Sequence, residues 1–76
     1  MSAVNLKKNK SNWTVSYIDN GEVMHLDFRT IEKAADFMID DLDVSDDVVD
    51  EALIYMIAND HNTAIISGEN VLTEDR

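Results

Sequence analysis

Residues 13–28 read WTVSYIDNGEVMHLDF, two runs in which apolar and polar residues alternate on either side of Asn20-Gly21. Asn-Gly is the preferred central pair of a type I′ turn, because both positions need a positive φ angle. A two-residue loop there pairs Asp19 with Glu22 and fixes the register of a hairpin over about 12–28. In that register six large apolar side chains share one face: Trp13, Val15, Tyr17, Met24, Leu26 and Phe28.

Two helices are predicted to follow the hairpin. Thr30 is a suitable N-cap, and apolar residues recur at helical spacing from Ile31 to Leu42, so the first helix is expected over about 31–42. Ser45 is a second cap candidate, followed by Asp46 and Asp47, where the helix dipole favours anions. The second apolar stripe predicts a helix over about 46–60.

The rest of the chain predicts strands at its two ends. The β-branched run 63–67 indicates a strand, residues 71–73 suggest one more, and 74–76 are expected to form a loose tail. Residues 1–10 suit either a basic arm or a short strand. The order of elements predicts a single α+β domain over 1–76, with both helices packed on one face of an antiparallel sheet.

The composition excludes several classes of protein. The chain has 76 residues, of which 45% are hydrophobic, with no Cys and no Pro. It therefore has no disulfides and no thiolate zinc site, and it is too apolar to be a disordered acidic tail. No apolar run approaches the roughly 20 residues of a membrane-spanning helix. The N-terminus also lacks the apolar stretch of a signal peptide, so we expect a cytoplasmic protein.

The negative charge is concentrated in the second half of the chain. The net charge is -10, with 16 acidic residues against six Lys and Arg. Residues 34–75 contain twelve of these acids and no Lys or Arg. Few of the carboxylates can therefore form internal salt bridges, and their mutual repulsion should lower the stability of the fold.

Catalytic and metal-binding sites are only weakly indicated. The hairpin register brings Ser16, His25 and Asp27 onto one face, but no glycine-rich oxyanion loop accompanies them. The segment from Asp41 begins like a calcium-binding loop, yet it lacks the glycine and the bidentate glutamate that such a loop needs. His25 and His61 lie on different elements. We therefore predict a non-enzymatic protein without a cofactor or metal ion.

Direct binding of nucleic acid is a further alternative. Lys7, Lys8 and Lys10 lie near Trp13 and Tyr17 in the sequence, a basic and aromatic grouping that could hold a single strand. The net charge of -10 opposes the approach of a polyanion. The sequence therefore favours a protein partner over a nucleic acid or a membrane.

The acidic residues of the two predicted helices are the strongest indication of function. Asp36, Asp40, Asp43, Asp47 and Asp50 are spaced by four and three residues, which within a helix places carboxylates about 5–6 Å apart on one face. This interval is similar to that of the phosphates along a nucleic-acid strand, so such a row could occupy a phosphate-binding groove. The predicted partner-binding residues are Asp36, Asp40, Asp43, Asp46, Asp47, Asp50, Glu51 and Tyr55.

Two functions are consistent with this surface. The first is a small inhibitor that mimics nucleic acid and occludes a basic protein surface, of the anti-restriction, anti-CRISPR or transcription-related type that phages and mobile elements encode. The second is a structural or regulatory homodimer whose acidic face is merely solvated. In the homodimer the helix 46–60, which is apolar around most of its circumference, would bury Ile54 and Tyr55 against a second copy.

Overall fold

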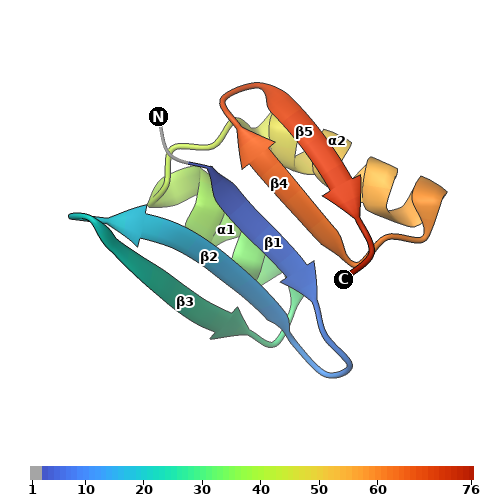
Figure 1. Ribbon diagram of the computed structural model, residues 1–76, viewed down its shortest axis with the longest axis horizontal. Helices are drawn as coiled ribbons and strands as arrows, with labels where there is room; N and C mark the ends of the chain where they lie inside the picture. The colour runs from blue at the N-terminus through green and yellow to red at the C-terminus, as the bar shows by residue number, and fades with distance from the viewer. Residues whose placement is uncertain (1–2) are drawn as a thin grey trace.

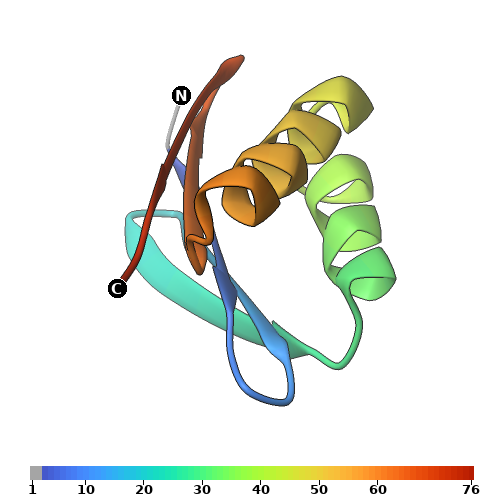
Figure 2. The same ribbon diagram turned by 90° about the vertical axis from the view of Figure 1, so that its right-hand side faces the viewer.

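The computed structural model describes residues 3–76, which form a five-stranded antiparallel sheet with two helices on one face (Figures 1 and 2). The strand order is β3-β2-β1-β4-β5. The strands are β1 (Val4–Lys8), β2 (Trp13–Asp19), β3 (Glu22–Phe28), β4 (Thr63–Ser67) and β5 (Asn70–Glu74). The helices are α1 (Ile31–Asp40) and α2 (Asp46–Asn59). The predicted α+β class is confirmed.

The hairpin β2–β3 has the predicted register. Asp19 pairs with Glu22, and Trp13 at the far end pairs with Phe28. The turn residues Asn20 and Gly21 have φ angles of 50° and 81°, as a type I′ turn requires. The apolar face of the hairpin packs beneath α1, where the rings of Tyr17 and Phe28 lie 5.5 and 5.4 Å from the ring of Phe37.

The first described segment is the central strand of the sheet rather than an arm. β1 pairs with β2 on one side and with β4 on the other, so Leu6 lies between Val15 and Ala64. Val4 and Leu6, which point toward the helices, are both buried. Burial of a leucine side chain stabilises a fold by about 2 kcal/mol, which explains why this short basic segment is held in the sheet.

Helix α1 begins as predicted and ends two residues early. The Thr30 side chain accepts a hydrogen bond from the backbone N–H of Lys33 at 3.3 Å. At the other end, the N–H groups of Asp41 and Leu42 both donate to the Phe37 carbonyl. Asp43 then adopts the left-handed conformation, with a φ of 58°. This tight reversal stops the helix at Asp40 instead of residue 42 and leads directly into α2.

Helix α2 begins at the predicted residue, but without the expected side-chain cap. Ser45 occupies the N-cap position and its side chain makes no capping hydrogen bond; only its carbonyl accepts, from the N–H of Val49. Asp46 and Asp47 lie in the first turn, where their charges interact favourably with the helix dipole. The helix ends at Asn59, because Asp60 takes the left-handed conformation with a φ of 53°.

The two helices divide the sheet between them, with α1 over β2 and β3 and α2 over β4 and β5. Figure 2 shows both helices on the same side of the sheet. Ala34 and Met38 from α1 meet Val49, Ala52 and Met56 from α2 in one core over the sheet. Among residues 3–76, no helix covers the opposite face of the sheet.

The C-terminal end is held more firmly than the sequence predicts. β5 extends to Glu74, and the backbone N–H of Arg76 donates to Asn62 Oδ1 at 2.8 Å. The Asn62 side-chain amide returns a hydrogen bond to the Arg76 carbonyl at 2.7 Å. The predicted tail over 74–76 is therefore shorter, because Glu74 belongs to β5, and one side chain of the α2–β4 connection binds both backbone groups of Arg76.

Candidate functional site

The predicted partner-binding residues lie on the two helices and on the short connection between them. Asp36 and Asp40 are on α1, Asp43 is in the connection, and the remaining five are on α2: Asp46, Asp47, Asp50, Glu51 and Tyr55. All of them are exposed except Glu51, which is half-buried. They therefore lie on the solvent-facing surface of the helices and of their connection.

The helix carboxylates have no basic partners within the described part of the chain. Across residues 3–76 the ion pair is that of Glu74 with Arg76, at the far end of β5. The helices themselves hold a single base, Lys33, on α1. The acids from 36 to 51 thus face solvent without internal neutralisation, as the absence of bases between 34 and 75 predicts.

The outward surface of α2 changes character along its length. Its first two turns present the carboxylates of Asp46, Asp47 and Asp50. Its later turns present Ile54 and Ile57, which are 62% and 81% exposed. The two isoleucines lie on neighbouring turns and form a small exposed apolar patch. The helix thus joins an acidic patch to an apolar one.

Tyr55 is a further exposed side chain of α2. It is 41% exposed and lies one turn after Glu51. A hydrogen bond to Glu51 and the negative charge of that carboxylate raise the pKa of the Tyr55 phenol above its ordinary value. The phenol therefore stays neutral throughout the physiological pH range.

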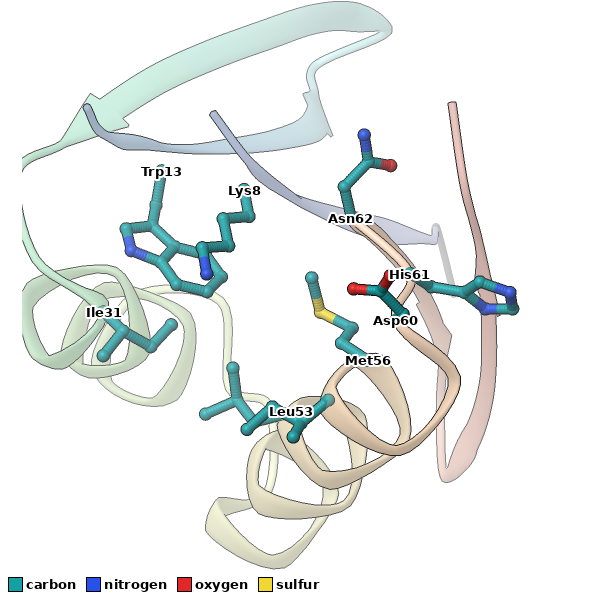
Figure 3. A pocket seen from close by; sticks show the side chains of 9 residues that line it. Lys8, Trp13, Ile31, Leu53, Met56, Asp60, His61 and Asn62 are labelled. Carbon is teal, nitrogen blue, oxygen red and sulfur yellow. The ribbon is translucent and has the colours of Figure 1, made fainter. Parts of the chain in front are cut away.

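A cavity of about 420 Å³ opens between the two helices and the sheet (Figure 3). In Figure 3, Trp13 and Lys8 lie on one side, while Leu53, Met56 and Asp60 lie on the other. The Lys8 Nζ is 5.8 Å from the centre of the Trp13 ring, within the range of a cation–π interaction. The apolar walls come from three regions of the chain: Trp13; Ile31; and Leu53, Met56 and Ile57.

The sequence did not predict this cavity. Leu53 and Ile57 are part of the apolar stripe that predicts the helix over 46–60, whereas the surface predicted for a second copy is Ile54 and Tyr55. A smaller cavity of about 210 Å³ lies at the opposite end of the helices. Asp43 and Ser45 line it from the α1–α2 connection, and Glu69 lines it from the β4–β5 turn.

The helix-free face of the sheet carries hydrogen-bonded polar pairs. Ser16 Oγ and His25 Nδ1 are 2.7 Å apart, and the Thr14 hydroxyl donates to Asp27 Oδ1 at 2.7 Å. Asp27 is thus engaged by a threonine rather than by His25, so the three residue types do not form a Ser–His–Asp relay. These contacts are ordinary cross-strand pairs of a solvated face.

The other sequence candidates are separated in space. His61 Nδ1 lies 2.9 Å from Thr73 Oγ1, on a different element from His25. Within residues 3–76, no three His, Asp or Glu side chains are grouped so that they could hold a metal ion. The basic and aromatic grouping is also divided, because Tyr17 packs on Phe37 of α1 and is not available for base stacking.

No family model, no curated protein and no solved structure matches this chain. Neither helix described over residues 3–76 has the length and apolar character needed to cross a membrane.

Proposed function

We propose that this protein is a small, non-enzymatic binding protein of the cytoplasm that presents its helix carboxylates to a basic protein surface. In its specific form it is an inhibitor that mimics nucleic acid and occupies the phosphate-binding groove of a restriction or CRISPR effector, a nuclease, a repressor or a polymerase. Such an inhibitor is of the kind that phages and mobile elements encode. It acts by steric and electrostatic occlusion.

The observation that carries this proposal is the exposure of unpaired carboxylates on two packed helices. Asp36, Asp40, Asp46, Asp47 and Asp50 are all exposed, and among the described residues none has an ion-pair partner. Because the helices are packed on the sheet, these charges are fixed before binding and lose little conformational entropy in the complex. Lys and Arg residues that neutralise phosphates would neutralise them with the same dependence on salt.

The proposal is tested by charge reversal with a matched control. Asp36, Asp40 and Asp50 are changed together to Lys, which avoids the first turn of α2 and its favourable dipole interaction. The control changes Asp19, Glu22 and Glu69 to Lys. These three exposed acids lie in or beside the β2–β3 and β4–β5 turns, and their replacement alters the net charge by the same amount. Tagged wild-type protein is expected to retain nucleic-acid-binding proteins from a lysate at low salt, and duplex DNA should displace them.

The helix triple variant should lose this capture, and the turn triple variant should keep most of it. Equal capture by both variants would show that net charge alone attracts the partner. Recovery of no protein other than the tagged chain itself would contradict the proposal.

The exposed apolar residues support the homodimer as a second candidate. Ile54, Tyr55 and Ile57 are 62%, 41% and 81% exposed in the last two turns of α2. Against it, each copy carries a net charge of -10, so association is opposed by repulsion. Sedimentation equilibrium at high salt tests it: a dimer that Ile54→Asn dissociates would favour this candidate, and a monomer would exclude it.

A further inference from the structure

The cavity between the helices lies on the same strip of α2 as several of the acids. Asp46, Asp50, Leu53 and Ile57 recur at spacings of four and three residues, which places them along one side of the helix. Leu53 and Ile57 line the cavity, and Asp60, at the C-cap of the helix, lines it as well. The strip therefore presents carboxylates at both ends and apolar side chains in the middle.

We propose that this cavity binds an apolar side chain of the basic partner, one that is flanked in the partner's sequence by Lys or Arg. The inference rests on the proposed function and specifies the partner segment. The apolar side chain enters between Trp13 and Leu53, and the flanking cations lie against Asp50 and Asp60. The volume of about 420 Å³ is within the range of pockets that hold side chains and small ligands.

Lys8 does not prevent this arrangement. Its ammonium group lies 5.8 Å from the centre of the Trp13 ring, on the wall opposite Asp60 in Figure 3. The cation–π interaction holds it there, and it is a single cation beside a strip with three carboxylates. The electrostatic preference of the opening therefore remains for a cationic segment.

A second copy of this chain is a poor occupant. Its basic segment, Lys7 to Lys10, adjoins Leu6, but the Leu6 side chain is completely buried in the core and cannot enter another molecule. The segment 34–75 of a second copy contains the exposed isoleucines of α2 but no Lys or Arg. If one of those isoleucines entered the cavity, the acidic residues beside it would bring further negative charge to the opening. A different, basic protein satisfies both the charge and the apolar walls.

The test uses the full chain and two capped peptides, Lys-Arg-Leu-Arg-Lys and the same peptide with glycine at the centre. Trp13 is the only tryptophan and lines the cavity, so its fluorescence reports occupancy directly. Burial of a leucine side chain in the cavity is expected to make the leucine peptide bind at least about tenfold more tightly than the glycine peptide. Both affinities should fall steeply with salt.

Two isoleucine variants make the test specific. Ile57→Asn changes a residue of the cavity wall, and Ile54→Asn makes the same change on the same helix outside the cavity. Ile57→Asn should reduce the preference for leucine to about threefold or less, whereas Ile54→Asn should preserve it. Equal binding of the two peptides to the wild type, or an equal loss in both variants, would overturn the inference.

The same titrations separate this inference from the proposed function. If both peptides bind equally and the helix triple charge reversal abolishes this binding, the acidic surface is the binding site and the cavity is excluded. Absence of binding by both peptides at low salt would overturn the inference and count against the proposed function as well.

Discussion

Replacement of Asp50 by Lys is expected to stabilise the protein. Asp50 is exposed on α2 and follows Asp46 and Asp47 by four and three residues, so it lies beside both on the helix surface. Each like-charged pair at such spacing costs about 0.2–0.5 kcal/mol, and an acid followed by a base contributes a similar amount. Two repulsive pairs become two attractive ones, which adds about 1 kcal/mol to the free energy of unfolding.

Thermal unfolding at low ionic strength measures this effect. For a domain of this size, about 1 kcal/mol raises Tm by roughly 4–8 °C. Asp50→Gln is the control, because Gln is a good helix former that removes the repulsion without adding attraction, and it should give a smaller increase. In about 1 M NaCl, where the screening length is about 3 Å, the difference between the two variants should largely disappear.

A Tm of Asp50→Lys at or below that of Asp50→Gln at low salt would refute this prediction. That result would mean that the carboxylates of α2 are not close enough to repel one another, or that another group already neutralises them. If Asp50→Lys raises Tm and also abolishes capture of the partner, then Asp50 lowers the stability of the free protein and contributes to binding.

Three further predictions concern the core, the turn and Tyr55. Leu6→Ala should lower the free energy of unfolding by about 2–5 kcal/mol in urea titrations, while Leu72→Ala, at a leucine that is 63% exposed on the helix-free face, should change it by less than about 1 kcal/mol. Gly21→Ala should cost about 1 kcal/mol in the same assay, because φ is 81° there and an added Cβ meets no neighbouring atom, so the whole cost is backbone strain. Glu51→Gln should lower the pKa of Tyr55 toward its ordinary value in a titration followed by ultraviolet absorbance; an unchanged pKa would mean that Glu51 does not contact the phenol. Since the folded-state pKa of Tyr55 is raised, its contribution to stability is present below the ordinary pKa and is lost as the pH rises through the folded-state value.

The parts of the fold that depend on neighbouring residues were predictable from the sequence. The turn at Asn20-Gly21 fixes the hairpin register because the chemistry of two adjacent residues determines every pair along the strands. Thr30 caps α1 for the same reason, since its side chain reaches an N–H only three residues away. In both cases the alternation or spacing of apolar residues agrees with the local signal.

Features that join distant segments were not predictable in this way. Nothing in the sequence near Val4 states that Ile66 will pair with it, because strand order depends on the packing of the whole sheet. The hydrogen bonds between Asn62 and Arg76 likewise appear only once β5 is in place. The cavity is of the same kind, since Trp13, Ile31 and Leu53 are brought together by three different elements.

The exposure of the acidic residues was predictable, but their arrangement was not. A region without Lys or Arg cannot neutralise its own carboxylates, and the absence of ion pairs on the described helices follows from that. The position of Asp43 depends on the left-handed backbone of the connection, which no periodic pattern reveals. The role of these residues in binding a partner remains a prediction.

The central position of β1 has a consequence for how the protein folds during synthesis. Leu6 needs Val15 on one side and Ala64 on the other, and the second neighbour is made only when most of the chain has been translated. While residues 63–67 are still inside the ribosome, one edge of β1 stays unpaired, although the hairpin beside it can already form. The final step brings together Leu6 and Ala64, which are far apart in the sequence. Folding should therefore be slower than that of a helical protein of similar size. A nascent chain stalled before residue 63 should therefore remain sensitive to protease within its first ten residues.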